Sequence, residues 1–203
     1  MEAPFDKIGL QQKLSKLPAW KATAFGLSIA ERMLPNYVLF SRDENVVVPA
    51  VLRSALNIAW DWLQDGATTR DLLVLAEECD AAAPETEKFT SLYVSSALDA
   101  AVSVGFLLRF ILDGDIQHVA EVASLARDSI DLYVQEVERF PSRSPDLEGL
   151  ILRHSLMQQE LMRQKKDLSF ISHTIDAREV AGVIFRERWF ANQLGRQMFH
   201  KES

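Results

Sequence analysis

Apolar residues recur at three- and four-residue steps along most of the chain, which is the period of an amphipathic α-helix. The clearest example lies within residues 115–139, where Val119, Val122, Ala126 and Ile130 fall on one face. Prolines divide the chain into segments that each show this period. The pattern predicts helices at about residues 5–16, 19–34, 36–43, 49–64, 69–82, 88–112, 115–139, 146–171 and 175–194.

Signals for helix ends support this division. Gly66 suits the left-handed residue that follows the helix at 49–64, and a threonine ahead of Asp71 suits the cap of the next helix. Ser144 and Pro145 suit the N-cap and first position of the helix at 146–171. The β-branched run at 45–49 is too short to argue for a sheet. We therefore expect an all-α fold, a single compact bundle of about seven to nine helices over residues 1–203, with a frayed tail from about residue 195.

Composition and charge narrow the classes of partner and location. The 203-residue chain is 48% hydrophobic and has a formal net charge of −7. Residues 43–99 hold eleven acidic and three basic side chains, which disfavours binding to nucleic acid or to an anionic membrane. The uncharged run at 100–108 is far shorter than the roughly 20 residues of a membrane span. A single cysteine, Cys79, and a start without a signal-peptide pattern lead us to expect a cytoplasmic protein.

Several common chemistries are absent from the sequence. It contains no glycine-rich nucleotide loop, no GxSxG, no HExxH and no ExxH pair. One cysteine cannot supply a multi-thiolate metal site. We therefore expect no cofactor, no metal centre and no catalytic residue recognisable from a motif.

Two sets of polar residues stand in apolar surroundings. Ser95, Ser96, Asp99 and Ser103 line one stripe of the apolar helix at 88–112. Three interpretations of this stripe are open. It is a structural polar seam in which the serines donate to Asp99, a polar seam that binds a ligand, or a stripe exposed to solvent. His154 lies within an apolar face of the helix at 146–171. It is a hydrogen-bonded core histidine, or a catalytic or metal-binding group with partners on other helices.

The segment ERMLPNYVLF at 31–40 places two charges just before a proline. At about 100° per residue, Glu31 falls on a largely apolar side of the helix, whereas Arg32 falls with Lys21 and Ser28 on a solvent stripe. We therefore expect Glu31 to be buried and Arg32 to be exposed.

The second half of this segment predicts a helix corner. Pro35 should end or kink the helix, because it has no N–H and disfavours helical geometry at the preceding residue. Asn36 can cap the next helix, and Tyr37 and Phe40 can pack back onto the first. Glu31 can then accept hydrogen bonds from freed amides or from Tyr37. On this interpretation the motif residues are structural.

Three stretches resemble a known family. LPAWKATAFGLSIAERMLPNYVLF at 17–40, SALDAAVS at 96–103 and HVAEVASLARDS at 118–129 are similar to the YjaG-like bacterial proteins, a domain of unknown function. The resemblance covers about residues 14–140 and is most specific at Glu31, Arg32, Met33, Pro35, Asn36 and Tyr37. It implies a compact all-helical fold and no known activity, cofactor or partner.

Three functions remain open. The first is a non-enzymatic helical interaction or scaffold protein, a homo-oligomer or the partner of another protein. The second is a small-molecule binder that uses the seam around Asp99. The third is an enzyme in which carboxylates such as Glu31 and Asp99 converge with His154 in one cleft. We expect the first.

Overall fold

The structure of the protein, a computed structural model, describes residues 5–68, 70–140 and 145–174, together with Arg178, Gly182 and residues 184–186. These residues form eight α-helices and one short 3-10 helix, with no strand among them, so the prediction of an all-α bundle is confirmed. The elements are α1 (Lys7–Leu14), α2 (Ala19–Asp43), α3 (Ala50–Asp65), α4 (Leu72–Ala81), η1 (Thr86–Lys88), α5 (Val94–Asp113), α6 (Ile116–Glu138), α7 (Leu147–Arg153) and α8 (Ser155–His173).

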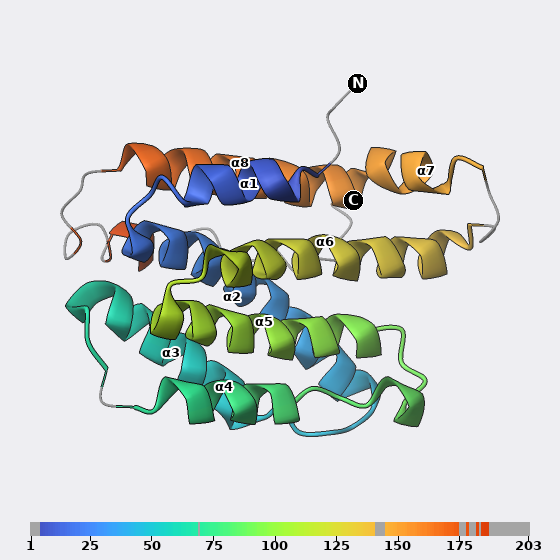
Figure 1. The fold of residues 1–203 in the computed structure, drawn as a ribbon. Coiled ribbons are helices and arrows are strands. Elements are labelled where there is room, and N and C mark those ends of the chain that lie inside the picture. Colours follow the sequence, from blue (N-terminus) through green and yellow to red (C-terminus); the bar gives the residue numbers. More distant parts are fainter. Residues whose placement is uncertain are drawn as a thin grey trace.

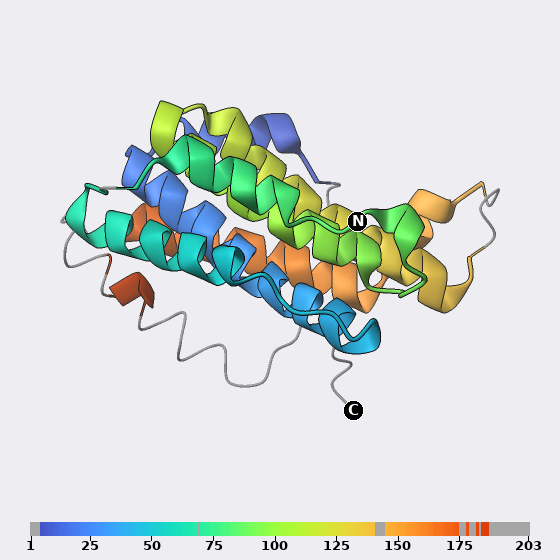
Figure 2. The ribbon, with the colours of Figure 1, turned by 90° about the horizontal axis from the view of Figure 1, so that it is seen from below.

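Helix α2 is the centre of the bundle (Figures 1 and 2) and packs against α3, α5, α6 and α8. Helix α5 lies between α4 and α6, and α4 forms the lower edge of the view in Figure 1. Helices α1 and α8 both pack against α6. Helices from the middle and the end of the chain therefore pack against the sides of α2.

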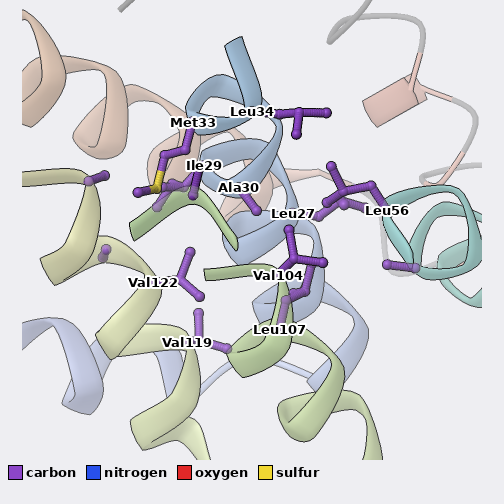
Figure 3. Close-up of a cluster of buried hydrophobic side chains, with 14 of the residues drawn as sticks. Leu27, Ile29, Ala30, Met33, Leu34, Leu56, Val104, Leu107, Val119 and Val122 are labelled. Carbon is purple, nitrogen blue, oxygen red and sulfur yellow. The ribbon is translucent and has the colours of Figure 1, made fainter. Parts of the chain in front are cut away.

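A large part of the core lies where α2 faces α3, α5 and α6 (Figure 3). Burying each large aliphatic side chain here contributes about 1.5–3 kcal/mol. Gly26 permits the close approach of α2, because a Cβ at this position would lie 3.1 Å from a methyl group of Leu107. The labelled side chains that meet in this region are Leu27, Ile29, Ala30, Met33, Leu34, Leu56, Val104, Leu107, Val119 and Val122.

Helix α5 is long and apolar enough, by composition alone, to cross a membrane. However, 67% of its most apolar window is buried inside the bundle. Ala97, Ala101 and Val104 on this helix have no exposed surface. Such burial is that of the core helix of a soluble protein rather than of a lipid-facing span.

Several helix ends differ from the prediction. Gly66 ends α3 with φ +79°, as expected, but Asp71 itself caps α4 by accepting hydrogen bonds from the amides of Leu73 and Val74 at 3.0 and 3.2 Å. The residues near 88 form η1 and an irregular segment, so α5 begins only at Val94.

The predicted helix at 175–194 and the predicted tail from about 195 lie largely outside the described residues. Where the chain is described there, it returns to the bundle. Arg178 donates to the carbonyls of Trp62 and Leu63, the latter at 3.0 Å, and lies 4.2 Å from the ring centre of Trp62. Phe185 is buried against Trp20 and Phe170. The prediction of one domain across all 203 residues stays a prediction.

Candidate functional site

Helix α2 runs through Pro35 without a break, so the predicted helix corner is wrong. Pro35 has no N–H to donate to the carbonyl of Glu31, which disfavours a helix at this point. Burial of the flanking residues outweighs this cost, because Met33, Leu34 and Tyr37 are all packed in the core. Asn36 lies inside the helix with no exposed surface, so it is not a cap.

Glu31 is buried, as predicted, with 1% of its surface exposed. Its donors are not the predicted ones. Arg53 of α3 binds both carboxylate oxygens, at 2.8 and 2.9 Å, and the indole N–H of Trp60 donates to Oε1 at 2.9 Å. Three charge-assisted or directed hydrogen bonds therefore compensate the burial of this carboxylate. They also attach α2 to α3.

Arg32 is not exposed, which corrects the prediction. Its side chain is 10% exposed, and the guanidinium contacts Asp167 at 2.6 Å and Glu160 at 3.0 Å, both on α8. Burial disfavours the charged form, but the negative charges of Glu160 and Asp167 outweigh it and raise the pKa of Arg32.

The whole predicted solvent stripe of α2 is in fact covered. The Lys21 ammonium donates to the carbonyl of Thr174 at 2.8 Å, and the Ser28 hydroxyl lies 3.3 Å from a carboxylate oxygen of Asp167. Helix α8 and the residue that follows it thus pack over a stripe that a helical wheel assigns to water. The polar stripe of α2 therefore packs against complementary polar groups of α8 and the residue that follows it.

Glu160 and Gln164 were missed by sequence analysis. Glu160 is 1% exposed, and its Oε1 accepts from Arg32 and from the Gln164 amide at 3.1 Å. Gln164 also donates to the carbonyl of Ala123 at 3.1 Å, which joins α8 to α6. The Oε2 atom of Glu160 is buried and has no hydrogen-bond partner among the described residues. The available signal was the spacing of residues 160, 164 and 167, which places three polar side chains on one face.

Tyr37 and Phe40 contact each other, with ring centres 5.7 Å apart in an edge-to-face arrangement, but because α2 is continuous they do not pack back onto a preceding helix as predicted. The Tyr37 hydroxyl donates to the carbonyl of Ala82 at 2.7 Å, just beyond α4, rather than to Glu31. Burial raises the pKa of Tyr37. The motif residues therefore attach α2 to α3, α8 and the end of α4.

The polar seam on α5 is closed by α6. The Ser129 hydroxyl donates to Asp99 Oδ2 at 2.8 Å, and Asp99 is 8% exposed. Ser96 and Ser103 donate instead to the carbonyls of Tyr93 and Ala100 on their own chain segment, so they are not the predicted donors to Asp99. Ser95 is half-buried. Burial raises the pKa of Asp99 to about 6; the Ser129 hydrogen bond opposes the shift and the charge of Asp128 adds to it.

His154 does not lie within a helix, which corrects the prediction. The expected helix at 146–171 is divided into α7 and α8, and His154 is the N-cap of α8. Its Nδ1 atom accepts from the amide of Leu156 at 3.3 Å, and its Nε2 atom lies 3.4 Å from a carboxylate oxygen of Glu138. Ser144, the predicted cap, lies outside the described residues, and α7 begins after Asp146.

The three proposed catalytic groups do not bind one another. Glu31 binds α3, Asp99 binds Ser129 of α6, and His154 binds at the start of α8 and near the end of α6. Within the described ranges, no group of three histidine, cysteine or carboxylate side chains has a metal-binding arrangement. Cys79 is buried, and burial together with Asp80 and Glu78 raises the pKa of its thiol to about 12.

Comparisons with known proteins place this chain among uncharacterized bacterial proteins. The uncharacterized protein YjaG of Escherichia coli K12 is 28% identical over 116 residues, which cover 55% of this chain and 57% of that protein. An uncharacterized protein of Haemophilus influenzae is 24% identical over 132 residues, 62% of this chain and 65% of that one. The matches thus span less than two thirds of these relatives' lengths.

A solved structure and a family model extend the match over nearly the whole chain. The crystal structure of a DUF416 family protein from Shewanella baltica has a TM-score of 0.78 and 25% identity, covering 94% of this chain and 95% of that one. The model of the family described as "Protein of unknown function (DUF416)" matches residues 9–185, beyond the 14–140 of the resemblance seen in the sequence. The chain therefore belongs to the DUF416 family of proteins of unknown function.

Proposed function

We propose that this protein is a non-enzymatic interaction protein of the bacterial cytoplasm, which binds another protein chain through the outer face of α4. The observation that carries this proposal is the exposure of Leu73 and Val74, each 48% exposed on adjacent positions of one helix. The described elements against which α4 packs are α3 and α5, and they cover its other side. Covering two such side chains with a partner is favourable, because it removes apolar surface from water.

The motif on α2 supports a structural role for the interior. Glu31 and Arg32 are each bound by charged side chains of this same chain. Groups used in this way hold helices together and are not presented to a substrate. The residues that are most specific to the family resemblance thus maintain the bundle, and we assign recognition to its surface.

The two alternative functions have less support. A ligand at the Asp99 seam would need free hydrogen-bonding groups. Ser96 and Ser103 already donate to backbone carbonyls, and the Ser129 hydroxyl already donates to Asp99. A catalytic site would need Glu31, Asp99 and His154 to face one another, and each binds a separate partner.

Site-specific photocrosslinking in bacterial cells tests the proposal. A photoreactive amino acid at Val74 should give a defined adduct with another protein or with a second copy of this chain. The same amino acid at Lys166, an exposed residue of α8, is the matched control and should give no such adduct. Light scattering on the purified protein then separates a homo-oligomer from a monomer with a different partner. Absence of an adduct at Val74, together with a strictly monomeric protein, would contradict the proposal.

A further inference from the structure

We infer that the partner of α4 is a basic amphipathic segment of a protein, with lysine or arginine side chains one helical turn from apolar ones. This inference rests on the proposed function and goes further by naming the chemistry of the partner. It is argued from the outer face of α4, where two apolar and two acidic side chains are exposed together: Leu73, Val74, Glu77 and Glu78.

The geometry of α4 brings these side chains together. Residues four apart lie on the same side of a helix, so Glu77 follows Leu73 and Glu78 follows Val74 along the exposed face. The opposite face of α4 is buried and consists of Leu72, Leu75, Ala76 and Cys79. In Figure 1 the helix lies at the edge of the bundle, and Figure 2, seen from below, shows it among the nearest elements. One surface therefore offers apolar contact and negative charge in adjacent rows.

The acidic charge of this surface is only partly offset by neighbouring basic side chains. Residues 71–88 contain six acidic side chains and one basic one. Asp80 is paired with Arg109 and Glu85 with Lys88, and the Asp71 carboxylate caps α4. By contrast, Glu77 and Glu78 make no ion pair or hydrogen bond with any described side chain, although the hydrogen bond with Asp80 and, to a lesser degree, the charge of Glu77 raise the pKa of the nearby Arg109 guanidinium.

Charge complementarity then selects the partner. Basic side chains placed one turn from apolar ones can meet Glu77 and Glu78 while the apolar ones cover Leu73 and Val74. An anionic membrane or a nucleic acid would place like charges against this face, so both are excluded as partners. A neutral apolar partner would leave the two carboxylates partly desolvated without a counter-charge, which is unfavourable.

Peptide binding to the full-length protein tests the inference. The probes are two fluorescently labelled helical peptides with the same pattern, one of leucine and lysine and the other of leucine and glutamate. Fluorescence anisotropy should show binding of the leucine–lysine peptide only. The variant E77K/E78K should weaken this binding by about tenfold or more, because attraction is replaced by repulsion at the contact. The variant L73S/V74S should also weaken it.

Matched variants separate this face from the general acidity of the protein. The variant E136K/E148K, at exposed positions of α6 and α7, changes the net charge by the same amount as E77K/E78K. The variant L132S/V137S removes two exposed apolar side chains from α6, as L73S/V74S does from α4. Both should bind the leucine–lysine peptide as the native protein does, with circular dichroism confirming that every variant is folded. Equal weakening by E136K/E148K, binding of the leucine–glutamate peptide, or no binding of either peptide would overturn the inference.

The photocrosslinked partner distinguishes this inference from the proposed function. If the partner segment crosslinked at Val74 carries lysine or arginine beside apolar residues, both the interaction function and the basic-partner inference stand. If an adduct forms at Val74 through an acidic or uncharged segment, the interaction function stands and the basic-partner inference fails.

Discussion

Glu31 and Arg32 are consecutive residues of α2, yet they bind two different helices. The Glu31 carboxylate lies 2.8 Å from Arg53 of α3, whereas the Arg32 guanidinium lies 3.0 Å from Glu160 of α8. Neighbouring helical residues differ in direction by about 100°, so one dipeptide can attach one helix to two others. A buried ion pair is weak evidence for net stability, but removing one partner leaves an uncompensated buried charge. This asymmetry makes both contacts testable.

Replacing Arg53 by alanine should lower the free energy of unfolding by about 2–4 kcal/mol, because Glu31 loses two of its three hydrogen bonds while it stays buried. Urea denaturation measures the change. Arg42→Ala, at an exposed position of α2, is the control and should have a much smaller effect. Similar losses in both variants would show that Arg53 does not support Glu31.

A double-mutant cycle on Arg32 and Glu160 should reveal a coupling free energy above about 1 kcal/mol, because the two groups are in contact and shielded from water. The same cycle on Arg153 and Asp146, an ion pair in which both side chains are 65% exposed, should show no significant coupling. Thermal and urea unfolding of the single and double alanine variants supply the values. Equal coupling in the two cycles would contradict a special role for the buried pair.

Asp99 should make stability depend on pH. Its pKa is raised from an ordinary 3.8 to about 6, so the folded state binds more protons than the unfolded state between these values. Stability therefore falls as pH rises through this window, by as much as about 2–3 kcal/mol. Asp99→Asn should remove this fall and raise the free energy of unfolding at pH 7.

Two further variants check the assignment to Asp99. Ser129→Ala removes its hydrogen-bond donor, so the fall should extend to higher pH. Asp128→Asn should leave most of the decrease in stability with rising pH in place, although burial also raises the pKa of Asp128. Unfolding curves measured from pH 4 to pH 8 test both. A pH profile unchanged by Asp99→Asn would refute the prediction.

Pro35→Ala should stabilise the protein by about 1–3 kcal/mol, because alanine restores an N–H that can donate to the carbonyl of Glu31 inside α2. The measurement is the urea midpoint at constant m-value. Pro49→Ala, at the residue before α3, changes no bond within a helix and is the control. A destabilised Pro35→Ala variant would show that packing of the proline ring matters more than the missing hydrogen bond.

Hydrophobic period predicted most helices of the bundle, because apolar residues at helical spacing have to face a common core. The helix prediction failed at Pro35, where the proline rule wrongly indicated a break, and at His154, where the apolar period wrongly indicated a continuous helix. Burial on both sides of Pro35 keeps α2 continuous despite the missing N–H. At His154 an apolar pattern continues through a chain that turns, and the imidazole caps the next helix. At Pro35 local propensity and tertiary packing disagree, and packing decides.

The candidate site was predictable only in part. The apolar neighbours of Glu31 indicated that it is buried, which is correct. Its donors Arg53 and Trp60 lie 22 and 29 residues away, and nothing in the local pattern selects them. Arg32 was misplaced because a helical wheel cannot show that α8 covers its stripe.

By itself, the sequence determined the all-α class, most helix positions and the excess of acidic side chains, because each follows from composition or local spacing. The family was indicated by the resemblance of three stretches to known proteins. Only the tertiary structure decided which polar stripes meet. It placed Glu31 against α3, Arg32 against α8 and Asp99 against Ser129, and it left the acidic face of α4 exposed. Such pairings depend on how helices far apart in the chain cross one another, and the period of a single helix carries no information about its neighbour.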